Sequence, residues 1–274
     1  MAKRDRGGRP LKLLLLLWRQ RELLGLLVAR DLRGRWAGSW LGPGWALLTP
    51  LVQLAVLTLV FSAVLHVRFA PSGAMAQGPF ALALAWGLFP WIAAQDGLTR
   101  AASSLVDGAV LVRRLSIEPA LLPAVPVLSA LVQVTATLVV VGGLSAFAGW
   151  PVAPSVVLCL PVLVVQGALV LGLGGLASVG HAYLRDIAAL VSTLLQIGFY
   201  LSPIVYSVSV APESLRDILW LNPMAGLIEA MRAFAFGEAP PWRALAWSTL
   251  CAAGAISAAG WAFARAAAEL PDLV

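Results

Sequence analysis

Oppositely charged residues occur at helical spacing at two points in otherwise apolar sequence. Arg100 follows Asp96 by four residues, and Arg232 follows Glu229 by three. Charges inside apolar helices usually mark ion or proton pathways, but so few are present here that a proton relay is disfavoured. We expect Asp96 and Arg100 to pair with each other at the end of a helix. For Glu229 and Arg232, a local pair and a contact that gates a pathway are both open.

Other arrangements that carry chemistry are missing from the sequence. It contains no Walker-type phosphate loop, no cluster of metal ligands and no Ser/His/Asp set. His66 and His181 each lack a nearby carboxylate or second ligand. Cys159 and Cys251 lie in apolar stretches, where a thiol behaves as a small hydrophobic group. We therefore predict that the chain has no catalytic residue, no metal site and no cofactor of its own.

Long stretches without a charged residue indicate the class of protein. No Asp, Glu, Lys or Arg occurs between Arg35 and Arg68, or in the 66 residues between Glu118 and Arg185. Hydrophobic residues make up 60% of the chain and charged residues 12%, and the mean hydropathy is +0.89. A bilayer core about 30 Å thick needs roughly 20 apolar helical residues per crossing. The sequence therefore predicts an all-α integral membrane protein.

Six transmembrane helices are predicted. The expected crossings cover residues 45–65, 77–98, 120–147, 155–179, 187–207 and 244–264. They form a transmembrane domain over residues 41–265, between a cytoplasmic segment of residues 1–40 and a cytoplasmic tail of residues 266–274. Six crossings place both termini on one side of the membrane.

The basic residues predict which side that is. Of the 19 Lys and Arg residues, 15 fall on the side of the termini and 4 on the other. Short loops rich in Lys and Arg stay in the cytoplasm, so both termini are predicted to be cytoplasmic. Ten of the basic residues precede Trp36, beside the first crossing. This position indicates contact with membrane lipids and not with nucleic acid.

Residues 11–36 have the pattern of an amphipathic helix. One arc is apolar and carries Leu16, Leu17, Leu23, Leu24, Leu27 and Val28. The opposite arc carries Arg19, Glu22, Arg30 and Arg33, while Gln20 and Asp31 interrupt the apolar side. Such a helix is typical of the membrane interface. Packing on a partner protein is an alternative, and both can hold at once.

Two connections are too long to be simple turns. Residues 99–119, on the cytoplasmic side, predict a short amphipathic helix over residues 103–114. Residues 209–242, on the outer side, are apolar for a loop, and Asn222-Pro223 breaks them into two half-length helices. This pattern predicts a re-entrant hairpin, which a membrane allows only where protein buries it. A loop lying on the outer surface explains the pattern equally well.

Four short motifs occur in order along the chain. They are Leu41-Gly42-Pro43-Gly44-Trp45 with Pro50, then Tyr183-Leu184-Arg185-Asp186, Ser202-Pro203-Ile204-x-Tyr206, and Leu221-Asn222-Pro223-Met224, followed by Phe263-x-Arg265. Each is weak alone. In this order, within six crossings, they resemble the type-2 ABC exporter permeases of the polysaccharide class, which export O-antigen, teichoic acid and related glycans.

The resemblance implies a permease subunit that moves a lipid-linked cell-surface polysaccharide across the bacterial cytoplasmic membrane. It implies two copies of a separate ATP-binding subunit, which would hold the ATP and Mg²⁺, and a second copy of this chain. Contacts with that subunit are expected at Arg30, Asp31, Arg33, Asp107, Val110, Leu111, Arg113 and Arg114. In the predicted cytoplasmic helix, the apolar pair would fill a cleft and the charged residues would fix the register.

Aromatic residues could line a path for the glycan. The candidates are Trp86, Phe89, Trp91, Phe199 and Tyr200. Aromatic side chains near the ends of crossings more often form an interfacial belt, so that alternative is also open.

Two other functions remain compatible with the sequence. A type-2 permease for a lipid, drug or other small amphiphile would share the fold and the mechanism. A secondary transporter or a non-transport membrane scaffold would belong to another class. Inverted repeats would favour the secondary transporter, but crossings one to three show no convincing similarity to crossings four to six.

Overall fold

The computed structural model describes residues 10–64, 66, 79–110, 117–150 and 152–270. All regular elements in these ranges are helical, which confirms the predicted all-α class. They are α1 (Pro10–Arg19), α2 (Arg21–Gly34), η1 (Gly42–Gly44), α3 (Trp45–Thr58), the π-helical turn η2 (Leu59–Val64), α5 (Phe80–Asp107), η3 (Pro119–Leu121), α7 (Ala124–Phe147), η4 (Pro154–Leu158), α8 (Cys159–Tyr183), α9 (Asp186–Tyr200), η5 (Val208–Val210), α10 (Glu213–Leu221), α11 (Pro223–Phe236) and α12 (Trp242–Ala266).

Four helical segments in the described part of the chain are long and apolar enough to cross a membrane. They are Gly42–Ser62, Pro119–Phe147, Pro154–Tyr183 and Trp242–Ala266. These segments overlap the first, third, fourth and sixth predicted crossings. The helix at the second, α5, is long enough but contains Gln95, Asp96 and Arg100, and α9 at the fifth has only 15 residues. The protein is thus a multi-pass membrane protein, while the six-crossing topology stays a prediction.

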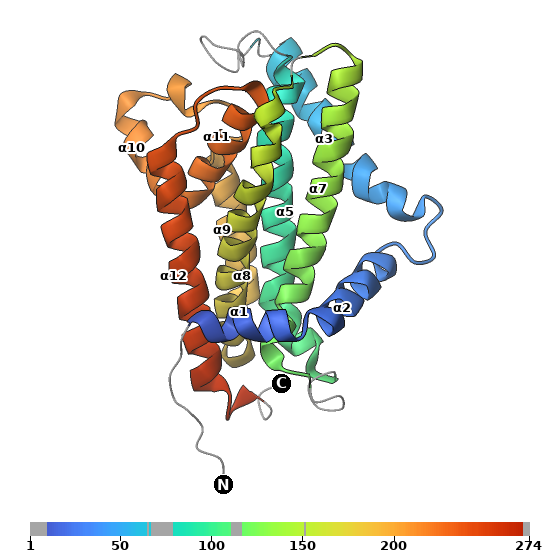
Figure 1. Ribbon diagram of the computed structural model, residues 1–274, viewed down its shortest axis with the longest axis vertical. Helices are drawn as coiled ribbons and strands as arrows, with labels where there is room; N and C mark the ends of the chain where they lie inside the picture. The colour runs from blue at the N-terminus through green and yellow to red at the C-terminus, as the bar shows by residue number, and fades with distance from the viewer. Residues whose placement is uncertain (1–9, 65, 67–78, 111–116, 151, 271–274) are drawn as a thin grey trace.

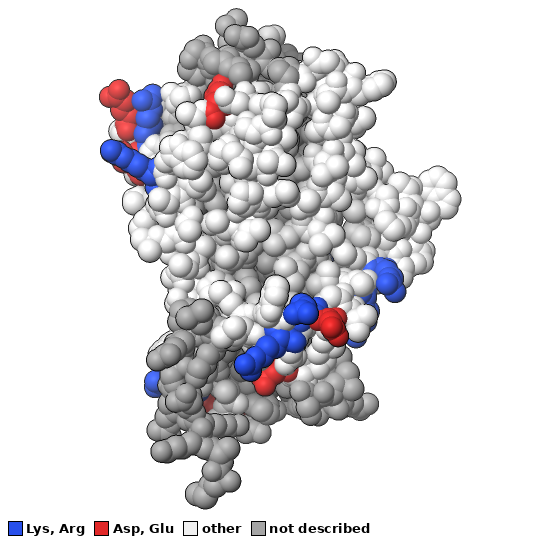
Figure 2. Space-filling model, in the orientation of Figure 1, with Lys and Arg blue, Asp and Glu red and all other residues white. Residues whose placement is uncertain are grey.

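Charged side chains lie toward the two ends of the molecule. On the face drawn in Figure 2, blue and red atoms gather along α1 and α2 below and near α10 above, with a broad white band between them. Burying a charge in hydrocarbon is costly, so a membrane protein keeps its charges outside that layer or pairs them. The white band is therefore the part of this surface that suits the bilayer core.

Helix α5 lies at the centre of the bundle, and every residue from Leu82 to Trp91 is buried. It packs against α3, α7, α8, α9 and α11 (Figure 1). Helices in a membrane associate mainly through close van der Waals contact, which small residues permit. Gly174 of α8 lies against Ala101 of α5, and Gly172 lies directly against the α12 backbone at Ala255 and Ile256. These contacts bring α8 close to both neighbours.

The predicted helix over residues 11–36 is two helices, because the chain bends at Gln20 between α1 and α2. The predicted apolar arc faces the bundle: Leu24 and Leu27 are buried, whereas Arg19 and Glu22 are exposed. Leu24 packs with Ile117, Leu121 and Ala124, and α1 lies across α12 (Figure 1). The arc therefore contacts protein, which accounts for the break that lets each half follow its own neighbour.

The prediction of a separate cytoplasmic helix over residues 103–114 is wrong for the first half of that range. Residues 103–107 continue α5, since nothing between Thr99 and Asp107 breaks the helix. The helix ends at Gly108, where a Cβ atom would lie 2.6 Å from Leu122 Cδ1. Ala109 and Val110 are helical again, whereas Leu111, Arg113 and Arg114 lie outside the described residues.

The predicted break in the outer connection is present between α10 and α11. Helix α11 runs antiparallel to the start of α12: Ser248 Oγ donates to the Pro223 carbonyl at 2.6 Å, and the Phe234 and Trp242 rings lie 6.2 Å apart. The break at Asn222-Pro223 therefore lies beside α12, at a level between one and two helical turns past Trp242, its first residue. Every residue of α11 from Met224 to Phe236 is buried, whereas α10 is largely exposed.

The α8–α12 contact gives a test of the packing. Gly172→Ala should lower the free energy of unfolding by about 1–3 kcal/mol, because its Cβ would lie 2.5 Å from the α12 backbone. Thermal unfolding of the purified protein in detergent measures this change. Gly254→Ala is the matched control, since a Cβ there meets open space. Equal stability of the two variants would contradict the close approach.

Candidate functional site

Four alternating charges join α2 to α5, and we call them the charge ladder. On one side Asp31 and Arg35 lie four residues apart at the end of α2, and on the other Asp96 and Arg100 lie four apart on α5. Asp31 forms an ion pair with Arg100, and Arg35 with Asp96. Each acid thus faces a base across the interface, so the ladder fixes the register between the two helices.

The ladder extends to two further helices through Gln133 of α7. Arg35 Nη1 donates to Gln133 Oε1 at 2.6 Å, and Gln133 Nε2 donates to the Ala46 carbonyl of α3 at 3.1 Å. The four ladder side chains are only 19–30% exposed. Partly buried charges interact more strongly than charges in water. One connected network of polar side chains therefore links α2, α3, α5 and α7.

The predicted pair of Asp96 with Arg100 is present, at 3.6 Å, but it is not the main contact of either residue. Each makes a closer ion pair with α2. The sequence carried one signal for this: Asp31 interrupts the apolar arc of its helix because it faces Arg100. The participation of Arg35 and Gln133 was missed, since no local spacing relates them to α5.

Some residues predicted to contact an ATP-binding subunit meet beside the ladder. Arg30, Asp31 and Asp107 line one cavity of about 260 Å³ between α2, the end of α5 and the start of α7. Arg33 is exposed, and Val110 is 60% exposed. The structure thus brings α2 and the end of α5 to one surface, and the coupling role of that surface stays a prediction.

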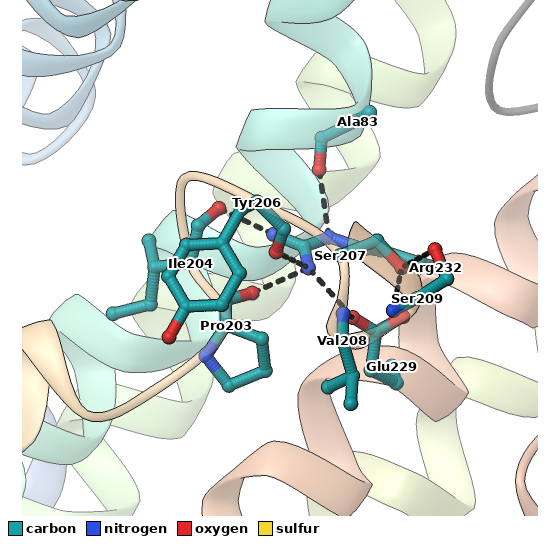
Figure 3. A network of polar contacts seen from close by, with 9 residues as sticks. All are labelled: Ala83, Pro203, Ile204, Tyr206, Ser207, Val208, Ser209, Glu229 and Arg232. Atoms are coloured by element: carbon teal, nitrogen blue, oxygen red, sulfur yellow. Dashed lines mark hydrogen bonds and ion pairs between the residues drawn. The ribbon is translucent and has the colours of Figure 1, made fainter. Parts of the chain in front are cut away.

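A second polar cluster lies at the other end of α5 and centres on Arg232, which is fully buried (Figure 3). The guanidinium donates to four backbone carbonyls and contacts one carboxylate. The carbonyls are those of Ala83, Pro203, Ile204 and Tyr206, and the carboxylate is that of Glu229, 3.4 Å away. One side chain of α11 therefore holds both α5 and the segment that follows α9.

Glycine at position 87 makes room for this guanidinium. A Cβ atom on Gly87 would lie 2.1 Å from Arg232 Nη2. The Glu229 carboxylate is also held by the Val208 N–H, at 3.1 Å. Two roles were considered for Glu229 and Arg232. The local ion pair is present, and a gating role stays a prediction.

Two of the predicted motifs touch beside this cluster. Asn222 Oδ1 accepts from the Met224 N–H at 2.9 Å and so caps α11, while Asn222 Nδ2 donates to Ser202 Oγ at 2.8 Å. A capped N-terminus suits Pro223 at the first helical position, since proline has no N–H to satisfy. Together with Pro203 and Tyr206, these side chains join the end of α9 to the hairpin.

The other motifs lie at the ends of helices. Gly42 has φ +53°, a value that favours glycine, and lies shortly before Trp45, the first residue of α3. Pro50, inside α3, is buried. Tyr183 ends α8 and donates from Oη to Glu269 Oε2 at 2.6 Å. Arg185, in the turn before α9, and Asp186, its first residue, are both exposed.

The aromatic candidates for a glycan path are not on one surface. Trp86, Phe89 and Trp91 are 2–3% exposed within the core. The Phe199 ring packs edge-on against Trp91 at 6.3 Å, and Tyr200 is 78% exposed. Their role in stacking on sugars stays a prediction.

Neither polar cluster is arranged for covalent chemistry, because each carboxylate in it is held by a guanidinium. In the described ranges no group of three or more His, Cys, Asp or Glu side chains could hold a metal ion. What both clusters do in this structure is fix helices relative to one another.

Comparisons with known proteins give a consistent result. The sequence model of a family described as ABC-2 type transporter matches residues 22–236. An O-antigen export system permease protein RfbA from Myxococcus xanthus is 31% identical over 238 residues, which cover 84% of this chain and 88% of the relative. A protein of the same name from Klebsiella pneumoniae is 24% identical over 212 residues, covering 77% and 79%.

The charge ladder predicts non-additive mutations. Asp31→Asn and Arg100→Gln should each lower the free energy of unfolding by about 1–2 kcal/mol, since each removes the closest ion pair of a partly buried partner. The double variant should cost no more than the worse single one. Thermal unfolding of the four proteins gives the coupling energy, with the exposed Arg33→Gln as control. Simple additivity would show that the two residues do not interact.

The cluster around Arg232 predicts a larger effect. Arg232→Met should lower the free energy of unfolding by about 3–5 kcal/mol, because Glu229 is left buried and unpaired. Adding Glu229→Gln should recover part of the loss. Arg216→Met is the control, since Arg216 on the exposed α10 also donates to backbone carbonyls. Thermal unfolding compares them, and a loss no larger than that of Arg216→Met would refute the anchoring role of Arg232.

Proposed function

Because this chain belongs to the ABC-2 type transporter family, we propose that it is the membrane-spanning permease subunit of an ATP-driven exporter of a lipid-linked cell-surface polysaccharide. The proposed cargo is supported by the similarity, over most of both chains, to the O-antigen export permease of Myxococcus xanthus. O-antigen, teichoic acid and related glycans share the lipid-linked form that this proposal requires.

ATP hydrolysis belongs, in this proposal, to a separate ATP-binding subunit. The permease sequence has no Walker-type motif, so the partner supplies the ATP and Mg²⁺ sites. Two copies of each subunit make up the transporter. The surface formed by α2 and the end of α5 suits the partner, because it gathers Arg30, Asp31 and Asp107. Movement of α2 would then reach α5 through the charge ladder.

The proposed orientation places α1, α2 and the end of α12 in or near the cytoplasm, in the bacterial inner membrane. It is supported by the excess of basic residues on that side. Six crossings then leave α10 and α11 at the outer side. Burial of α11 on all its residues from Met224 to Phe236 supports a re-entrant hairpin, because a bilayer tolerates a broken helix only inside protein.

Deletion of the gene tests the proposal. Cells without the chain should lose the surface polysaccharide and accumulate its lipid-linked precursor inside, and the wild-type gene should restore export. The purified chain alone should not hydrolyse ATP, whereas its complex with the ATP-binding subunit should. Gel analysis of surface glycan and phosphate release measure the two outcomes. Normal surface glycan in the deletion strain would refute the cargo, and ATP hydrolysis by the isolated chain would refute the division of labour.

A further inference from the structure

A cavity of about 350 Å³ lies between α3, α5 and α7, next to the charge ladder. Its polar side is formed by Arg35, Asp96 and Gln133. Trp45, Thr49 and Gln53 of α3 line it at intervals of four residues, which places them in one stripe on the helix. The volume suits a small ligand or a headgroup, and it is far too small for a polymer.

Thr49 and Gln53 are exposed polar residues on a helix that is long and apolar enough to cross a membrane. Polar side chains in such helices face a cavity or a partner, because hydrocarbon offers them no hydrogen bonds. Both of these side chains line the cavity beside the ladder. The Asp96 carboxylate pairs with Arg35 and lies 3.6 Å from Arg100, and its Oδ2 atom is buried. The cavity therefore offers mainly hydroxyl and amide groups to a ligand.

The charges beside the cavity favour a neutral ligand. Its one guanidinium, that of Arg35, and its one carboxylate, that of Asp96, already pair with each other. The side chains left for a ligand are mainly hydroxyl and amide groups, with Trp45 and Phe89 in the wall. Sugars combine many hydroxyl groups with apolar ring faces, which match such a lining.

A second cavity continues along the same helix toward its outer half. It lies between α3 and the start of α5, and its lining includes Leu51, Leu54, Leu59 and Ala81. From Thr49 to Thr58, α3 rises about 14 Å. An amphiphile in the inner leaflet has its headgroup at the cytoplasmic side and its chain toward the bilayer centre. The polar cavity followed by the apolar one has this order in the proposed orientation.

We infer that the cavity between α3, α5 and α7 binds the sugar next to the lipid anchor of the exported glycan, with the lipid chain along the outer half of α3. This inference rests on the proposed function and names the part of the substrate that one copy of the chain holds before export. Thr49 and Gln53 bond to sugar hydroxyl groups, and Trp45 lies against the ring. The site selects a sugar headgroup, whatever polymer follows.

Protection of a single cysteine tests the site. In the complex with the ATP-binding subunit, with Cys159 and Cys251 replaced by Ala, a water-soluble thiol reagent should modify Thr49→Cys. Octyl glucoside should slow the reaction saturably, on the order of fivefold when its free concentration L is about four times its Kd, because the unprotected fraction is 1/(1 + L/Kd). Octyl tetraethylene glycol ether and octylphosphocholine should not. Val52→Cys is the control, because it is 52% exposed on α3 and outside the cavity.

Two matched variants separate the sugar contact from the fold. Gln53→Leu should abolish protection by octyl glucoside and slow glycan export in cells, whereas Gln95→Leu, on α5 outside the cavity, should do neither. Three outcomes would overturn the inference: equal protection by all three amphiphiles, protection by octylphosphocholine alone, or no protection by any of them. The two proposals can also fail separately. If octyl glucoside protects the Thr49→Cys variant but wild-type cells export no glycan, the proposed function is refuted and the sugar site is retained.

Discussion

The position of the central helix depends on four charges. Asp31 and Arg35 of α2 bind Arg100 and Asp96 of α5, so the two helices cannot slide past one another without breaking both ion pairs. Helix α5 in turn contacts α3, α7, α8, α9 and α11. A displacement of α2 therefore has a direct route to the middle of the bundle. Two of these charges, Arg35 and Asp96, also line the proposed sugar cavity, so binding there and movement of α2 act on one group of atoms.

The first turns of α5 are held by a different interaction. Arg232 of α11 donates to the Ala83 carbonyl and to three carbonyls of the segment after α9. Between these two polar clusters α5 is fixed by close packing of buried residues and small side chains, and by a hydrogen bond of 2.7 Å from Gln166 Nε2 of α8 to the Pro90 carbonyl. Apolar contacts between helices gain little in lipid, because the lipid is equally apolar. Polar contacts at both ends therefore specify the arrangement, and close packing completes it.

The sequence predicted what depends on local pattern. The apolar arc of residues 11–36, the break at Asn222 and the helical class follow from spacing and composition, and all are present. The interactions between distant segments did not follow. Arg35 meets Asp96 across 61 residues and Gln133 across 98, and no periodicity relates them. The bend at Gln20 and the continuation of α5 through residues 103–107 likewise depend on which neighbours the helices meet. Asp31 on an apolar arc was the single local sign of a tertiary contact.

The fit of Arg232 beside Gly87 also couples the two positions in evolution. Any side chain at position 87 collides with the guanidinium, so a mutation there is harmful while Arg232 remains. Loss of Arg232 first is harmful as well, because the buried Glu229 then loses its cation. Each single change therefore passes through a damaged intermediate. The two sites, 145 positions apart along the chain, are expected to keep their present residues together or to change together.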